Sequence, residues 1–346
     1  MKPTLAILIT LIALLLPPPA VAAGKVESLE FESAVLAENI IGISPHRRIM
    51  VYTPANYTPS ARYPVIYYLH NLGWSGDRVF SVNKFNEVLD QAIERGDIPP
   101  VIAVVPDLTT NTMGTMLGNA RESGRWLDHI KNELVPLIDA RYPTVKSAKG
   151  RALSGDMLGA YGALKLAMFY PDTFASVYAL HPVANGIGEV LMRSRPDWAQ
   201  MNAATSWDDL KSNVYSEVFM LMAQGYLPNP NKPPFYADLM VEDIDGKLQV
   251  NVEHTRNLRR GFLLNEMLPD YAANLKQLCA LGFDWGRMDP NPDHVYGNQD
   301  FTRLLADYGI EHMAEEHGGG PWDRNWGLQG RMAERALPFL GKCLKT

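Results

Sequence analysis

The sequence predicts an α/β fold in which helices cover both faces of a mostly parallel sheet. Short apolar runs bounded by turn residues alternate with amphipathic helical segments along most of the 346 residues. The runs at 65–70 and 101–105 also end in polar residues, which is typical of buried parallel strands that lead into functional loops. Because 47% of the residues are hydrophobic, one large core is possible, and we assign residues 24–346 to one domain.

The predicted elements follow one another in a regular order. Strands are predicted at 29–36, 49–53, 65–70, 101–105, 149–154, 174–181, 283–286 and 311–316. Helices are predicted at 83–95, 126–142, 157–170, 271–281, 301–308 and 328–344. The alternation breaks at about 183–265, where Pro196 and a proline cluster at 228–234 predict a cap-like insertion over the carboxyl ends of the strands.

The first residues have the pattern of a secretory signal peptide. Lys2 precedes an apolar run at 5–16, and small residues follow at 20–23. We therefore predict that residues 1–23 are a signal peptide, cleaved near Ala22 or Ala23. The apolar run is too short to span a bilayer comfortably, so we expect a secreted or periplasmic protein without an integral membrane span.

Charge limits the partners that the protein can have. The formal net charge is −6, and the chain has no long run of Lys or Arg. This excludes nucleic acid as the main partner and favours a small or apolar ligand.

The two cysteines are predicted to be free thiols. Cys279 and Cys343 lie in two separate late predicted helices, 271–281 and 328–344, which would cover opposite faces of the sheet. An exported protein can form disulfides, but this arrangement disfavours one here.

Residues 151–164 contain the frame of a nucleophile elbow with a methionine at its apex. In G-x-S-x-G, a sharp turn lifts the central side chain above the sheet, and the next backbone N–H helps to form an oxyanion hole. Here the frame spans residues 155–159, with glycine at both ends and Met157 in the centre. A thioether has no proton to lose, so a base cannot activate Met157 as a nucleophile. Ser154 lies in the strand before the turn and is not expected to project into the cleft.

Several ordered segments carry a family resemblance. They are Val51-Tyr52-Thr53-Pro54 with Tyr57, residues 63–70, residues 133–136 with Tyr142, residues 151–164, residues 170–174 and residues 337–339. Together they resemble the α/β-hydrolase fold, and in particular the esterase D and antigen 85 group of secreted esterases and acyltransferases. The resemblance implies a triad of serine, acid and histidine placed at the elbow, after the penultimate strand and after the last strand.

At three of the four catalytic elements the chain departs from that pattern. The resemblance places the acid at Asp289, which is retained. Pro321 stands where the family has its histidine, and Met157 stands where it has serine. In the oxyanion loop Asn71 follows His70, where the family has glycine. Because the triad works as a unit, we predict that serine esterase activity is absent.

Side chains at the carboxyl ends of the strands form the candidate site. The catalytic candidates are Asp156, Asp289 and His317, and His317 is the candidate to replace the lost base. The candidate ligand-binding residues are His70, Asn71, Met157, Leu158, His181 and Trp322.

Several of these residues also allow a purely structural role. His70 and His181 can bond to loop backbone, His294 can lie on a solvated loop, and Asp156 can cap the following helix. Met157 can simply fill the vacated pocket with an adaptable apolar side chain. No pair of these histidines has the H-x-x-x-H spacing of a metal motif, so we predict no metal and no cofactor.

Three functions stay open at this point. The first is an exported esterase homologue that has lost triad chemistry and binds a small or apolar ligand, or a partner, in the inherited cleft. The second is a non-hydrolytic enzyme, such as an isomerase, lyase or cyclase, that uses Asp and His for acid–base chemistry. The third is an esterase or acyltransferase with an unconventional site, which Met157 disfavours.

Overall fold

An eight-stranded sheet forms the centre of the protein. We describe a computed structural model that covers residues 23–186 and 195–344. The strand order is β1-β2-β4-β3-β7-β8-β11-β12, and all pairs from β4 to β12 are parallel, whereas β1 and β2 are antiparallel to their neighbours. The bounds are β1 (Lys25–Glu32), β2 (His46–Thr53), β3 (Val65–Leu69), β4 (Ile102–Val105), β7 (Arg151–Asp156), β8 (Ser176–Leu180), β11 (Ala280–Gly286) and β12 (Met313–His317).

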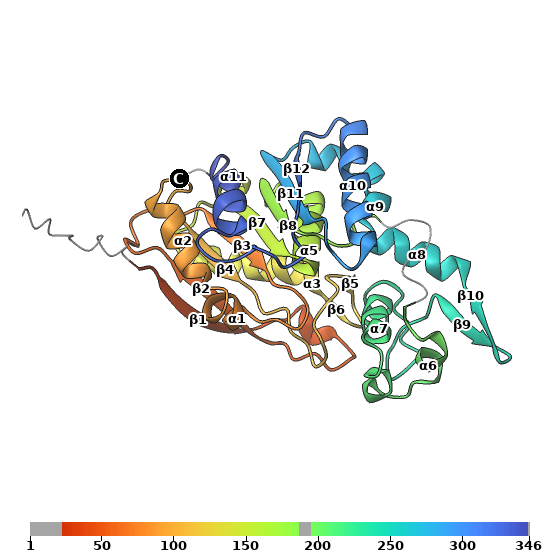
Figure 1. Cartoon of the computed structure of the whole chain (residues 1–346). Coiled ribbons are helices and arrows are strands. Elements are labelled where there is room, and N and C mark those ends of the chain that lie inside the picture. The colour runs from red at the N-terminus through yellow and green to blue at the C-terminus, as the bar shows by residue number, and fades with distance from the viewer. Residues whose placement is uncertain (1–22, 187–194, 345–346) are drawn as a thin grey trace, which may run out of the picture.

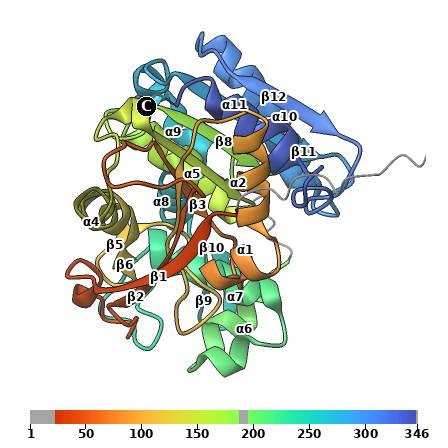
Figure 2. The same cartoon turned by 90° about the vertical axis from the view of Figure 1, so that its left-hand side faces the viewer.

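Helices cover both faces of this sheet, as the sequence predicts (Figures 1 and 2). One face carries α1 (Gly76–Ser81), α2 (Phe85–Glu94), the π-helix η5 (Met332–Ala336) and α11 (Leu337–Gly341). The other face carries α3 (Trp126–Asp128), η2 (His129–Leu134), α4 (Val135–Arg141), α5 (Leu158–Phe169), α9 (Leu264–Leu275) and α10 (Pro292–Asp307). Because successive residues of a strand point to opposite faces, the buried side chains form two separate clusters.

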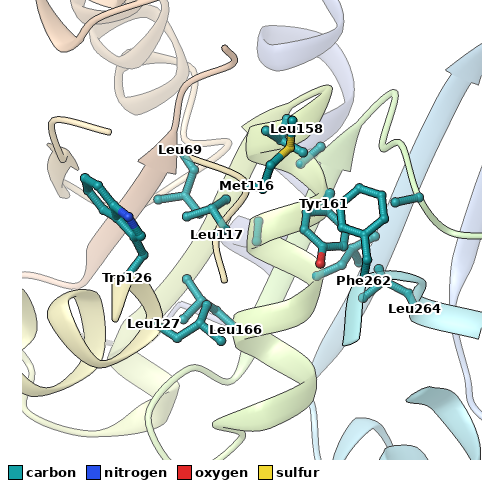
Figure 3. Packing of buried hydrophobic residues seen from close by; sticks show 14 of the residues in the cluster. Leu69, Met116, Leu117, Trp126, Leu127, Leu158, Tyr161, Leu166, Phe262 and Leu264 are labelled. Carbon is teal, nitrogen blue, oxygen red and sulfur yellow. The ribbon is translucent and has the colours of Figure 1, made fainter. Parts of the chain in front are cut away.

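The larger cluster lies around α5. Figure 3 shows part of it, with Leu69 of β3, Trp126 of α3 and Leu158, Tyr161 and Leu166 of α5. The helix α5 is buried on nearly every side, which explains why its sequence is apolar almost throughout, Lys165 excepted, rather than amphipathic.

Further short elements lie between strands and in the predicted insertion. Those of the insertion gather at one end of the molecule, away from α2 and α11 (Figure 1). They are α6 (Trp198–Ala203), η4 (Trp207–Leu210), α7 (Val214–Tyr226), β9 (Val241–Ile244), β10 (Lys247–Val250) and α8 (Val252–Phe262). The others are η1 (Leu36–Glu38), β5 (Asn119–Ala120), β6 (Gly124–Arg125) and η3 (Ala148–Gly150).

Prolines account for the largest errors in the predicted helices. The helix predicted at 271–281 is α9, which begins at Leu264 and accommodates Pro269 in its interior. The helix predicted at 301–308 is α10, which begins at Pro292, where a missing N–H costs nothing because first-turn amides have no helical partner. Both prolines look like breaks in the sequence, although neither ends a helix.

The prediction of free thiols is wrong, because Cys279 and Cys343 form a disulfide with their Cα atoms 5.9 Å apart. Cys279 lies between α9 and β11, and Cys343 follows α11. The helix α9 packs on α5 and α11 packs on α2, so the two helices do cover opposite faces. Both nevertheless run back to the amino ends of the strands, where the N–H of Cys279 bonds to the carbonyl of Ala175. The helix ends meet at that edge.

The predicted signal peptide lies outside the described residues, apart from Ala23. Within residues 23–186 and 195–344, no helix combines the length and the apolar character needed to cross a membrane.

Candidate functional site

Met157 occupies a sharp turn between β7 and α5. Its backbone has φ 51° and ψ −112°, a strained conformation that side-chain-bearing residues rarely adopt outside functional sites. The two flanking glycines are required by packing: a Cβ at Gly155 would lie 2.6 Å from the carbonyl oxygen of Leu69, and one at Gly159 would overlap the same oxygen. The chain therefore keeps the geometry of a nucleophile elbow around a methionine.

The backbone N–H that follows the apex is already occupied. The N–H of Leu158 donates a hydrogen bond to the side-chain oxygen of Asn71, at 3.2 Å. At a nucleophile elbow this N–H is the one that receives the oxyanion of a tetrahedral intermediate. In this protein the amide oxygen of Asn71 takes the place of that oxyanion.

A cleft of about 370 Å³ lies beside the elbow. Its walls are mainly apolar and include Leu72, Met113, Met116, Val183, Val218 and Met222. The polar groups that line it are few: Asn71, Tyr215, Asn291 and His294. An apolar cavity with few polar groups is typical of small-molecule sites.

Trp322 gives this cleft an exposed aromatic surface. Trp322, which lines it, is 43% exposed and stacks on Trp74 with ring centroids 5.4 Å apart. The guanidinium of Arg78 lies 4.6 Å from the centroid of the Trp74 ring. Of the predicted ligand-binding residues, the structure thus brings Asn71, Met157, Leu158 and Trp322 to one cleft.

Asp289 accepts hydrogen bonds from two histidines. His181 Nε2 lies 2.7 Å and His294 Nδ1 lies 2.8 Å from the same oxygen, Oδ2, and the N–H of Asn291 donates to Oδ1 at 2.7 Å. Burial opposes ionisation of this carboxyl, but the hydrogen bonds from His181, His294 and Asn291 hold its pKa well below the usual range. Asp289 is therefore a buried carboxylate that orients two imidazole rings.

The roles of the two histidines differ. His181 is fully buried, and its Nδ1 accepts a hydrogen bond from the N–H of Gly286 at 2.9 Å. His294 lies in the first turn of α10 and lines the cleft, and its Nε2 has no partner among the residues that the structure describes. His294 thus has the arrangement of a general base: a carboxylate holds one ring nitrogen, and the other is left for a ligand.

The cluster of His181, Asp289 and His294 brings three potential metal ligands within 4.8 Å of one another. The Gly286 N–H requires a lone pair on His181 Nδ1, so the ring proton sits on Nε2, where it bonds to Asp289. A protonated Nε2 cannot bind a metal. The geometry therefore favours hydrogen bonds from His181 and His294 to Asp289 over a metal site.

Asp156 lies away from the cleft. It is fully buried, makes no capping hydrogen bond to α5, and neither of its oxygens has a well-formed hydrogen bond within the described residues. Burial raises its pKa to about 7, against the opposing effects of the Tyr68 hydroxyl and the Asn71 backbone amide. Tyr68 belongs to the core beneath α2. The Asp156 side chain therefore lies on that face of the sheet, and only Met157 lines the cleft.

The histidines at the ends of β3 and β12 also lie outside the cleft lining. His70 is buried and uses both ring nitrogens on backbone groups, the carbonyl of Asn71 and the N–H of Leu108. His317 accepts the Gly319 N–H at Nδ1, and its Nε2 is buried without a partner among the described residues. Burial and the nearby charge of Arg331 lower the pKa of His317 to about 4. Ser154 is buried and donates its hydroxyl to the carbonyl of Tyr178.

The candidate residues predicted from the sequence do not include His294, for which a solvated loop is the favoured interpretation. The error follows from the late start predicted for α10, because His294 lies in the first turn of that helix. Its position five residues after Asp289, just beyond Pro292, is the signal that could have placed it.

A family model described as "Putative esterase" matches residues 43–232, which is more than half of the chain. The chain belongs to this esterase family. The family resemblance predicted from the sequence is therefore confirmed.

Two curated proteins are similar to this chain in sequence. It is 27% identical over 289 residues to "Esterase Rv1288" of Mycobacterium tuberculosis, covering 81% of this chain and 53% of that protein. It is 27% identical over 161 residues to "Uncharacterized protein YjcH" of Bacillus subtilis, covering 46% and 62%, respectively. The chain spans about half to three fifths of the length of these curated relatives.

Solved structures establish the fold. A ferulic acid esterase superposes with a TM-score of 0.64 at 17% identity, covering 93% of this chain and 99% of that chain. S-formylglutathione hydrolase from Staphylococcus aureus gives a TM-score of 0.57 at 15% identity, covering 92% and 99%. The predicted α/β-hydrolase fold is confirmed.

Proposed function

We propose that this protein is an exported member of the esterase family that binds a small apolar ligand in the Met157 cleft and forms no acyl-enzyme. One observation carries the proposal. The strained apex of the elbow holds a thioether, and the N–H beside it is occupied by the side chain of Asn71.

Both changes act on the same chemical step. Without a hydroxyl or thiol there is no nucleophile to attack an ester carbonyl. Without a free Leu158 N–H, one donor that would stabilise the oxyanion is lost, which alone costs about 10²–10³ in rate in serine hydrolases. The two losses together leave a binding cleft rather than an esterase site.

The cleft wall indicates what it would bind. A volume of about 370 Å³ suits a small organic molecule, and the methionines at positions 113, 116, 157 and 222 offer flexible apolar contacts. Trp322 adds an aromatic surface. We therefore propose an uncharged, largely apolar ligand.

A covalent probe tests the absence of esterase chemistry. We expect the native protein to be neither labelled by an active-site phosphonate nor active on p-nitrophenyl acyl esters. In the variant Met157→Ser with Asn71→Gly, a nucleophile and a free N–H are present, and Pro321→His adds the family base. Labelling of the triple variant would support an intact cleft. Labelling of the Met157→Ser, Asn71→Gly double variant would support it too, with His294 acting as the base that activates the serine. Labelling of the native protein would overturn the proposal and point to another nucleophile.

Ligand binding is tested separately with the neutral dye Nile red. Val218 lines the cleft, so Val218→Trp should fill it and weaken dye binding at least tenfold. Val252 is 65% exposed and does not line the cleft, so Val252→Trp is the matched control. Equal binding to both variants would show that the dye does not use this cleft.

The His294–Asp289 pair favours acid–base catalysis as the second candidate function. It supplies a base that could remove a proton from a bound ligand without a covalent intermediate. The test is exchange of α-protons of small ketones and esters in D₂O, followed by NMR. Exchange that is lost in His294→Gln but kept in the exposed control His46→Gln would support this function. No exchange with the native protein would count against it.

The disulfide supports the proposal of export. Disulfides persist in oxidising compartments and are rare in the cytosol. Mass spectrometry of the protein from culture supernatant or periplasm should find cleavage near Ala22 or Ala23. An uncleaved protein confined to the cytosol would contradict the proposal.

A further inference from the structure

A second cavity lies between α5, α7, α8 and α9. Its volume is about 830 Å³, and none of its lining residues lines the Met157 cleft. Part of its wall is aromatic: Phe169 stacks on Tyr271 with centroids 4.4 Å apart, and Tyr226 contributes a third ring. Neither the elbow nor the Asp289 cluster takes part in it.

Lys165 of α5 lines this cavity and is buried. Its Nζ donates to the hydroxyls of Tyr161 and Tyr226, at 3.1 and 3.0 Å, and to the carbonyl of Gly261, at 3.0 Å. The Tyr226 ring centroid also lies 4.5 Å from Nζ. All of these partners are neutral, and no ion pair of Lys165 is found within the described residues.

Such an arrangement is unusual for a buried ammonium. Buried charges in proteins are normally paired, because removing a cation from water is costly without a counter-charge. Burial alone lowers the pKa of Lys165 to about 7, with no carboxylate to oppose it. The cavity lining contains two acids, Glu266 and Asp270, and Glu266 forms an ion pair with Arg259 at 2.6 Å.

We propose that this second cavity binds an aryl carboxylate, whose negative charge compensates Lys165 and whose ring packs on Phe169, Tyr226 and Tyr271. Arg260 also lines the cavity and is exposed, so it offers a second cation nearer the solvent. The ligand would supply the counter-charge that the chain itself lacks.

Binding should then be coupled to protonation. A carboxylate favours the charged form of Lys165, so affinity should be high below pH 7 and fall as the pH rises above it. The other ionisable groups that face the cavity or contact Nζ are Tyr161, Tyr226, Arg260, Glu266, Asp270 and Tyr271. None of these provides a carboxylate bonded to Nζ.

The probe is 2-naphthoate, titrated into the full protein at pH 6 and pH 9 and followed by its fluorescence, with neutral 2-naphthamide as the uncharged analogue. We expect saturable binding of naphthoate, at least tenfold tighter than that of the amide and weaker at pH 9. Lys165→Met should weaken binding at least tenfold. Lys146 is exposed, so Lys146→Met is the matched control and should bind as the native protein does.

Three results would overturn the proposal: equal binding of acid and amide, undiminished binding to Lys165→Met, or no saturable binding of naphthoate. Loss of binding in Val218→Trp would also overturn it, because the ligand would then occupy the Met157 cleft. If Lys165→Met does not fold by circular dichroism, Lys165→Gln takes its place with the same expectation.

Discussion

At the scale of single residues, neighbouring positions at the end of β7 have opposite environments. Met157 faces the cleft, whereas Asp156 is buried on the side of Tyr68. The turn explains the difference, because Asp156 is the last residue of β7 and points into the sheet core, whereas Met157, with φ 51°, is the apex residue that the elbow lifts out of the strand. The carboxyl of Asp156 is therefore an unpaired buried acid rather than a cleft base.

The raised pKa of Asp156 makes stability depend on pH. In the unfolded chain this carboxyl ionises near pH 4, and in the folded protein near pH 7. Its contribution is thus fully present below about pH 4 and is lost as the pH rises to about 7, by up to about 4 kcal/mol. Asp156→Asn removes this loss. The free energy of unfolding of the variant relative to the native protein should therefore rise between pH 4 and pH 8.

Urea denaturation at both pH values measures this difference. Asp307 is exposed, so Asp307→Asn is the control and should give a difference that changes little with pH. If Asp156→Asn behaves like the control, the carboxyl is ionised in the folded protein at neutral pH.

At the scale of elements, the elbow depends on close contact between β3 and α5. The position that Cβ would take at Gly159 overlaps the carbonyl oxygen of Leu69, which is backbone and cannot rotate away. A helical glycine normally gains stability on change to alanine, by up to about 1 kcal/mol. Here packing between the two elements outweighs that helical preference.

We therefore predict that Gly159→Ala lowers the free energy of unfolding by about 3 kcal/mol or more, because β3 and α5 must separate. A Cβ at Gly318 would meet no atom within 4 Å, so Gly318→Ala is the control and should be nearly neutral. Thermal and urea denaturation measure both. A neutral or stabilising Gly159→Ala would show that the elbow can open without cost.

At the scale of the whole molecule, the disulfide ties the end of the chain to the start of β11. It closes a segment with a sequence separation of 64, which contains β11, α10 and β12. The crosslink lowers the conformational entropy of the unfolded chain, which stabilises the fold by about 4 kcal/mol in the loop-entropy model.

We predict that the double variant Cys279→Ala with Cys343→Ala is less stable than the native protein by about that amount. Denaturation by urea under non-reducing conditions measures it, and the native protein with added reductant should approach the double variant. The same stability with and without the disulfide would mean that the unfolded chain already holds these ends together.

Local patterns made much of the molecule predictable. Apolar runs and helical spacing located all eight strands of the main sheet within a few residues, and the glycines at 155 and 159 located the elbow. Predictions failed near two prolines: Pro269 lies inside α9 although proline disfavours a helix interior, and Pro292 begins α10 rather than preceding it.

The sequence by itself determined the fold class, the elbow and the methionine at its apex, because these depend on side-chain period, backbone freedom and the chemistry of one residue. Only the tertiary structure decided that Asn71 occupies the Leu158 N–H, that Asp289 holds His294 at the cleft, and that Cys279 meets Cys343. Apart from the local contact between Asp289 and His294, these contacts join separate segments of the chain. Packing of the whole sheet and its helices sets such distances, and no local pattern encodes them.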